Sequence, residues 1–284
     1  MKEKKWESAM LNSDTYNMYY NRLRDYAISL FAWEGLPESI NERFLEVTMF
    51  EEGRAVFFQD PAFGFMALPV MVGSPVNAYQ EPTEYRAVSI NYNKDLTPDN
   101  AVVIYNNFSR TSLLPTIRQY ALRLYQVERA MDVNIRTQKF PLLVLADESQ
   151  RMTMKNAYMQ YDGNEPFIFG NRSGFDKDSI QVLKTDAPFI ADKLMTYKHS
   201  IWNEAMSFLG INNSKQDKKE RLVEAEVSAN DEQVLGSRYV LLAARQAACE
   251  QINKMFGLNV SVDFKFNQEE PQAVDLEEQK EGAE

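Results

Sequence analysis

The stretch from Leu113 to Lys139 constrains the fold more than any other part of the chain. It contains no glycine, and its only proline, Pro115, lies in the first turn, where a helix tolerates it. Apolar side chains recur there at the spacings of a helix face, at Leu114, Ile117, Ala121, Leu124, Met131 and Ile135. At about 1.5 Å per residue this helix is ~40 Å long, whereas helices of globular domains average about 11–12 residues. The pattern therefore predicts one unusually long helix, which ends before Pro141.

A second long helix is predicted from Ala187 to Leu209, with Gly210 as its stop signal. Residues 141–186 between the two helices are predicted to form a small module of their own. Its expected elements are strands at 142–146, 166–169 and 180–183 and a short helix at 153–161. The arrangement is that of a helical hairpin with a small α/β domain at its tip.

The flanking regions are mixed in character. Residues 14–34 have helical periodicity, and residues 37–112 contain short apolar runs separated by glycine, proline and asparagine, which is typical of strands. Further on, Tyr239 to Phe256 is predicted to be helical, and residues 258–266 alternate as a strand does. Residues 213–230 are polar, with four cations and four anions, and are predicted to form a loop. The predicted fold class is α+β, mainly helical.

Charge and composition exclude several classes of protein. The chain has 284 residues, enough for about two domains. Its net charge is −10, of which −6 falls in the last 17 residues, so we expect residues 267–284 to be a solvated acidic extension. No apolar run approaches the ~18 residues of a membrane helix, and the start of the chain, MKEKKWESAM, has no secretory signal. The single cysteine excludes an internal disulfide framework.

Signals for catalysis are weak throughout. The sequence has no G-x-x-x-x-G-K-[ST] phosphate-binding loop and no G-x-G-x-x-G. Asp176 and Asp178 could hold a divalent cation, but a solvated loop fits them better. His199 and Cys249 fit structural roles better than catalytic ones, since Cys249 lies in an alanine-rich helix. We therefore expect no enzyme activity, no catalytic residue, no metal site and no cofactor.

Three arginines on the first long helix leave three interpretations open. Arg118, Arg129 and Arg136 are spaced by 11 and 7 residues, so they stay within ~20° of one line along the helix. They could follow a phosphate backbone, form ion pairs between subunits, or lie on an ordinary solvated face. The acidic balance argues against tight DNA binding, since tight binders are usually basic.

Six stretches together resemble the head–tail connector proteins of small short-tailed bacteriophages, also called portal or upper collar proteins. They occur in the family's order and span roughly residues 18–266: LFAWEGLPESI at 30–40, VVIYNN at 102–107, KTDAPFIADKL at 184–194, WNEAMSFLGI at 202–211, KKERLVEAEVSANDEQ at 218–233 and ACEQINKMFGLNV at 248–260. None of these stretches is catalytic.

The resemblance implies a ring of twelve subunits around an axial channel, with parts called wing, stem and clip. Applied to this chain, it makes the long helices the stem. The implied partition is 1–111 and 231–266 for the wing, 112–140 and 187–212 for the stem, 141–186 for the clip, 213–230 for a channel loop and 267–284 for the acidic extension. It also implies four channel-facing lysines that contact DNA, at Lys184, Lys193, Lys218 and Lys219. The expected channel-loop residues are Asn213, Lys215, Arg221, Glu224, Glu226 and Asn230.

The same resemblance implies where the protein works and with which partners. A connector sits at one vertex of the capsid in the virion, conducts double-stranded DNA during packaging and ejection, and contacts the major capsid protein, the packaging ATPase and the lower collar or tail proteins. A packaging RNA is a doubtful partner, because Glu3 and Glu7 interrupt the basic start of the chain. The alternatives are another neck or head-completion ring protein and, less favoured, a carboxylate-metal enzyme.

Overall fold

The computed structural model describes residues 2–73, 75–137, 142–144, 180–182, 188–212 and 224–265. The chain divides into two compact units, one made of residues 1–125 and 199–284 and the other of residues 126–198. The first unit is therefore discontinuous in sequence, because the chain leaves it and returns to it.

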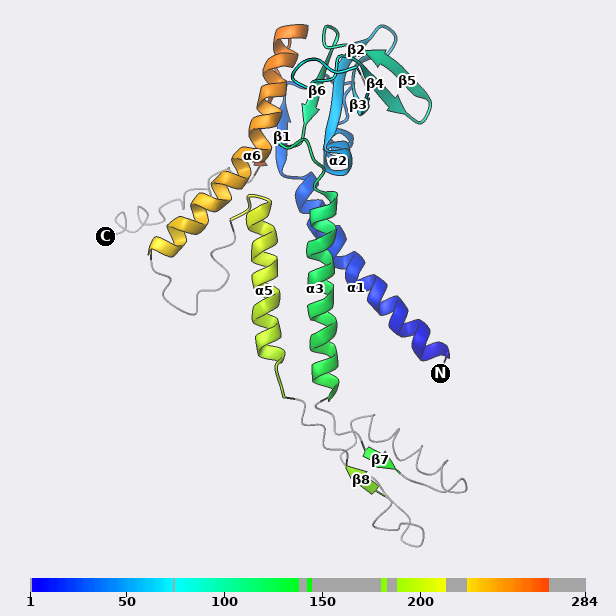
Figure 1. Ribbon diagram of the computed structural model, residues 1–284, viewed down its shortest axis with the longest axis vertical. Coiled ribbons are helices and arrows are strands. Elements are labelled where there is room, and N and C mark those ends of the chain that lie inside the picture. The colour runs from blue at the N-terminus through cyan, green and yellow to red at the C-terminus, as the bar shows by residue number, and fades with distance from the viewer. Residues whose placement is uncertain are drawn as a thin grey trace, which may run out of the picture. The chain divides into compact units, whose positions relative to one another are not determined.

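An antiparallel five-stranded sheet dominates the first unit, with strand order β5-β4-β3-β2-β6 (Figure 1). The strands are β2 (Arg54–Asp60), β3 (Gly64–Val72), β4 (Tyr85–Ser89), β5 (Tyr92–Leu96) and β6 (Ala101–Tyr105). One face carries an apolar cluster that includes Val56, Phe58 and Leu68. On the opposite face Phe57 packs against Phe256, with ring centroids 5.4 Å apart. Phe256 is the last residue of α6 (Glu224–Phe256), so this helix covers the second face of the sheet.

A second, two-stranded sheet joins residues 31–34 to residues 261–264. β1 (Phe31–Glu34) pairs antiparallel with β9 (Ser261–Phe264), and Phe31 lies opposite Phe264. β1 follows α1 (Lys2–Ile28) and precedes α2 (Glu42–Glu52). Gly53 ends α2 in a left-handed conformation, where a Cβ would lie 2.6 Å from the backbone of Thr111. Only glycine fits this close approach.

The long helices are α3 (Leu114–Thr137) and α5 (Ala191–Phe208), and within each unit their segments lie side by side (Figure 1). Ser112 caps the start of α3 by accepting a hydrogen bond from the backbone N–H of Leu114. In the first unit Ile117, Ala121 and Leu124 of α3 are fully buried. The second unit contains the remainder of both helices and the antiparallel pair β7 (Leu142–Val144) and β8 (Ile180–Val182).

The structure confirms the predicted fold class and the long helix, and it corrects several boundaries. Residues 31–34 are a strand and not the end of the first helix, because the alternating Phe31 and Trp33 are buried against β9. The sequence prediction missed α2 and β5. The helix expected from Tyr239 already begins at Glu224. The expected short helix at 153–161 and the strand at 166–169 fall outside the described residues.

Residues 224–230 of the expected channel loop are therefore helical, including Glu224, Glu226 and Asn230. Ser228 and Asn230 are good turn formers, but helix propensity is a weak preference that a long continuous helix overrides. The other expected loop residues, Asn213, Lys215 and Arg221, lie outside the described residues.

No helix in the described part of the chain combines the length and the apolar character that a membrane crossing requires.

Candidate functional site

Of the four lysines expected to contact DNA, Lys193 alone lies in the described part of the chain. It is exposed in the first turn of α5. Lys184, Lys218 and Lys219 lie outside the described residues, so the expected cluster of four stays a prediction.

Within each unit, polar contacts tie α3 to α5. In the first unit Glu204 of α5 accepts hydrogen bonds from Tyr120 and from Arg123, the latter at 3.0 Å. In the second unit Lys198 lies 2.6 Å from Glu128, the one acidic residue that interrupts the apolar stripe of α3. Asn134 accepts a hydrogen bond from the backbone N–H of Ile190, just before α5 begins. These contacts fix the pairing of the two helices residue by residue.

Two of the three arginines of α3 have described side chains, and their surroundings differ. Arg118 is exposed in the first unit. Arg129, in the second unit, forms an ion pair with Asp132 at 2.8 Å. The side chain of Arg136 is not among those described. Arg129 is thus engaged on its own helix, which fits an ordinary structural face better than a line of phosphate contacts.

Both long helices also carry exposed apolar side chains. These are Leu122, Val133 and Ile135 on α3, Met195 and Tyr197 on α5, and Phe189 just before it. Exposed apolar side chains mark an interface where they form a contiguous patch, whereas single ones occur on most protein surfaces.

A buried ion pair joins three distant parts of the first unit. Arg245 of α6 is 1% exposed and Glu46 of α2 is 2% exposed. The Arg245 guanidinium donates to both carboxylate oxygens of Glu46, at 3.1 and 2.9 Å, and to the backbone and side-chain oxygens of Asn106 at 2.9 Å. Its remaining N–H bonds the carbonyl of Leu241, and Trp33 donates to Glu46 at 2.8 Å. All five guanidinium donors are therefore satisfied.

Sequence reasoning missed this pair, although one signal was available. Arg245 lies on the same helix face as Leu241, Ala248 and Ile252, at spacings of four, three and seven residues. A charged residue inside an apolar helix face points to a buried partner.

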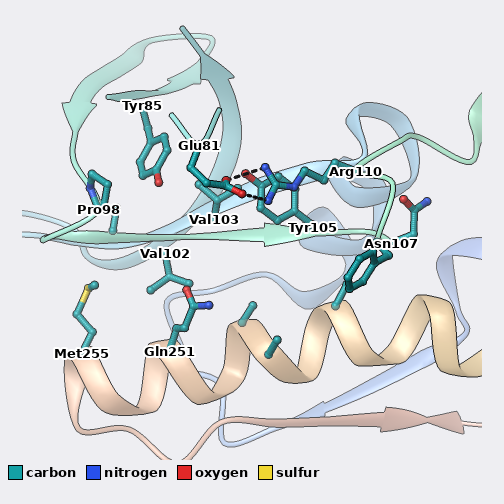
Figure 2. A pocket seen from close by; sticks show the side chains of 15 residues that line it. Glu81, Tyr85, Pro98, Val102, Val103, Tyr105, Asn107, Arg110, Gln251 and Met255 are labelled. Atoms are coloured by element: carbon teal, nitrogen blue, oxygen red, sulfur yellow. Dashed lines mark hydrogen bonds and ion pairs between the residues drawn. The ribbon is translucent and has the colours of Figure 1, made fainter. Parts of the chain in front are cut away.

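A pocket of about 400 Å³ lies between β6 and α6 in the same unit (Figure 2). One wall consists of Glu81, Tyr85, Tyr105 and Arg110, and the other of small α6 residues with Gln251 and Met255. Arg110 donates two hydrogen bonds to Glu81 and its guanidinium lies 4.4 Å from the centre of the Tyr105 ring. The hydrogen bonds from Arg110 lower the pKa of Glu81, whereas burial raises the pKa of Tyr105.

No chemically reactive centre appears in the described residues. Within the described ranges no three His, Cys, Asp or Glu side chains are grouped as a metal site requires. Cys249 is buried, and burial raises the pKa of its thiol to about 11. His199 lies on the exposed side of α5, and Asp176 and Asp178 fall outside the described residues.

The sequence of this chain matches the model of a known protein family. The sequence model described as Phage Connector (GP10) matches residues 4–269, nearly the whole chain. The chain belongs to the phage connector family. This confirms the resemblance found in the sequence, and the family is a structural one.

Comparison with solved structures gives the fold. The connector resembles a chain in the portal and tail of native bacteriophage P68 with a TM-score of 0.51 and 17% identity, over 96% of this chain and 92% of that one. It also resembles an HK97 family phage portal protein from Corynebacterium diphtheriae, with a TM-score of 0.48 and 12% identity over 87% of this chain and 91% of that one. A chain in the neck of a native gene transfer agent particle, computed with C12 symmetry, gives 0.46 and 11% over 90% and 80%. The first similarity shows a portal fold.

Proposed function

We propose that this connector forms a closed ring of twelve copies at one vertex of a phage capsid, and that double-stranded DNA passes through the ring during packaging and ejection. The match of residues 4–269 to the phage connector family carries this proposal. The portal fold supports it.

The surfaces of the long helices support assembly into a ring. In the first unit Leu122 is exposed on α3, and in the second unit Phe189 and Tyr197 are exposed near and on α5. Large apolar groups of this kind are stabilised when another subunit covers them. In a head-to-tail ring each subunit presents two different faces, one to each neighbour. The exposed apolar residues of α3 and α5 are our candidates for these faces.

The charge of the chain suits a protein that conducts DNA without holding it. The net charge of −10 disfavours tight binding, because each fixed cation that neutralises a phosphate strengthens binding through counterion release. We propose that Lys184, Lys193, Lys218 and Lys219 face the channel and give a weak, non-specific attraction. Residues 213–223 and the first turns of α6 would form the channel loop.

The proposed partners are the major capsid protein, the packaging ATPase and the lower collar or tail proteins. Because the sequence has no phosphate-binding loop, we assign ATP hydrolysis to a separate motor protein and propose that the connector is not an enzyme. A head-completion or other neck ring is the alternative within the same structural class.

The mass of the assembled protein tests the ring. Twelve copies of the 32.8 kDa chain have a mass of about 394 kDa. We expect light scattering coupled to size exclusion to give this value, and negative-stain images to show a ring with an axial hole. A monomer or dimer at micromolar concentration would refute the proposal. A ring that lacks the flared shape of a portal would favour the head-completion alternative.

The lysines can be tested separately from assembly. We expect Lys218→Ala with Lys219→Ala to leave the mass of the ring unchanged and to reduce the salt dependence of the DNA dwell time in the channel. Lys254→Ala, an exposed lysine in the last turn of α6, is the matched control. If Lys254→Ala has the same effect on the salt dependence as the double variant, Lys218 and Lys219 do not line the channel.

A further inference from the structure

The pocket between β6 and α6 runs along the edge of a strand. Four of the five β6 residues line it: Ala101, Val102, Val103 and Tyr105. Consecutive side chains of a strand point to opposite faces of its sheet. In Figure 2 Val102 points toward α6, whereas Val103 and Tyr105 lie on the side of Glu81 and Arg110. A pocket lined by both sets follows the edge of the strand and not one face of the sheet.

This edge of β6 has no partner strand in the described part of the chain. β6 is the last strand in the order β5-β4-β3-β2-β6 and pairs with β2 on one side only. An edge strand presents a row of backbone N–H and C=O groups, which are the template for adding another strand. Proteins usually cover such an edge or protect it with charges. Here the edge opens into a pocket.

The α6 wall leaves room for side chains of an added strand. Ala244, Ala247, Ala248, Gln251 and Met255 lie within ~60° of one line on the helix, and three of the five are alanines. Small side chains at these positions keep the helix backbone close to the pocket without filling it. An extended segment beside β6 would direct every second side chain toward this row.

The opposite wall carries no net charge. Glu81 and Arg110 are the two charged residues of the described lining, and their bidentate ion pair neutralises both. Tyr105 lies against the Arg110 guanidinium and completes this wall. A strand laid over this half-exposed ion pair would bury it, and an unpaired charge at the centre of that strand would then be costly. The lining therefore favours a segment without charged side chains at its centre.

We propose that the groove between β6 and α6 binds an extended, uncharged segment of a different polypeptide chain, which adds to β6 as a sixth strand of the sheet. Backbone hydrogen bonds to the strand edge would supply affinity. The row of alanines would select apolar side chains at alternate positions, as in other cases of strand addition. The five residues of β6 match a partner segment about 17 Å long.

The geometry of a ring argues against a sheet that continues from β6 into the β5 edge of a second copy of the connector, and this step rests on the proposed function. The other free edge of the sheet is β5. Neighbouring strands are rotated by about 20–25°, so five steps from one β5 to the next would turn the chain direction by ~100–125°. A ring of twelve turns each subunit by only 30°. A sheet continued from copy to copy would therefore not close into this ring.

Hydrogen exchange with a selected peptide tests the proposal. Random seven-residue peptides displayed on a carrier are selected on the assembled wild-type protein and counter-selected on Ala247→Leu, which fills the groove from an exposed helix position. Gln246→Leu adds the same side chain on the opposite side of α6 and is the matched control. We expect selected peptides with apolar residues at alternate positions and no central charge. A synthetic copy of a selected peptide should slow hydrogen exchange of the 101–105 amides about tenfold or more and leave exchange of the 92–96 amides unchanged. The same peptide should lose its binding to Ala247→Leu but not to Gln246→Leu.

Several results would overturn the proposal. Each would show that something else fills the groove, or that nothing does. Slow exchange of residues 101–105 in the ring without peptide, and fast exchange in the dissociated subunit, would mean that a second copy fills the groove. If deletion of residues 267–284 makes hydrogen exchange of the 101–105 amides faster, then residues 267–284 of the chain itself fill the groove. Failure to select any peptide that distinguishes the wild type from Ala247→Leu would mean that the groove binds no strand. The mass of the ring is measured on the same samples, so failure of the ring and failure of the groove are separate outcomes.

Discussion

Breaking the buried pair between Arg245 and Glu46 should cost the connector a large part of its stability. Arg245→Met would leave the Glu46 carboxylate almost fully buried, with Trp33 as its remaining side-chain donor among the contacts described. The oxygens of Asn106 would lose two donors at the same time. Removing one partner of a buried ion pair typically costs 3–5 kcal/mol. A domain has only about 5–15 kcal/mol of net stability.

Urea unfolding followed by tryptophan fluorescence measures this loss, with all variants compared at one subunit concentration because assembly adds to stability. The matched control is Arg86→Met. The Arg86–Asp95 pair is exposed on both sides, and exposed pairs contribute about 0–1 kcal/mol.

The double variant Glu46→Leu with Arg245→Met removes both buried charges. We expect it to lose clearly less stability than the sum of the two single changes, because neither charge is then left uncompensated. If Arg245→Met lies within about 1 kcal/mol of the parent, or no lower than Arg86→Met, the pair does not hold the unit together as argued.

The other predictions concern the stem, the sheet, the thiol and the acidic end. Leu124→Asp places a charge at a fully buried position, so it should lower the unfolding free energy by several kcal/mol and abolish the ring. Leu122→Asp changes an exposed position, so it should change the mass of the ring but not the fold. The hydrogen bonds to Asp60, led by the one from the Tyr92 hydroxyl, lower the pKa of its carboxyl group. The contribution of Asp60 to stability is therefore present above pH ~4 and is lost as the pH falls. Asp60→Asn should make the melting temperature depend less on pH in the acid range. Because burial raises the pKa of Cys249 to about 11, Ellman's reagent at pH 8 should label the folded protein at least ~100-fold more slowly than the unfolded chain. Deleting residues 267–284 should leave unfolding free energy within about 1 kcal/mol of the parent, and a larger loss would mean that this end docks.

The parts of the fold that local sequence determines were predictable. The long helix was found nearly to the residue, as Leu114–Thr137, because its apolar period and the proline that follows it are local signals. Alternation also placed Val262 and Phe264 correctly on a buried strand face, although the strand runs from Ser261 to Phe264 and not over the expected 258–266.

What depends on distant partners was not predictable. Phe31 and Trp33 continued a helical period in the sequence, and only their pairing with β9 makes them a strand. The Arg245–Glu46 pair joins positions 199 residues apart, and no local pattern identifies such a partner. The free edge of β6 follows from the order of the strands, which single-sequence periodicity does not encode.

The pairing of β1 with β9 sets the earliest time at which the two-stranded sheet can form during synthesis. Phe31 is synthesised early, yet its partner Phe264 follows about 230 residues later. At roughly 5–20 residues per second the first strand therefore waits about 10–45 s for its partner. We therefore expect the two-stranded sheet to form only after residue 264 has been synthesised, so that a chain cut before β9 lacks this sheet.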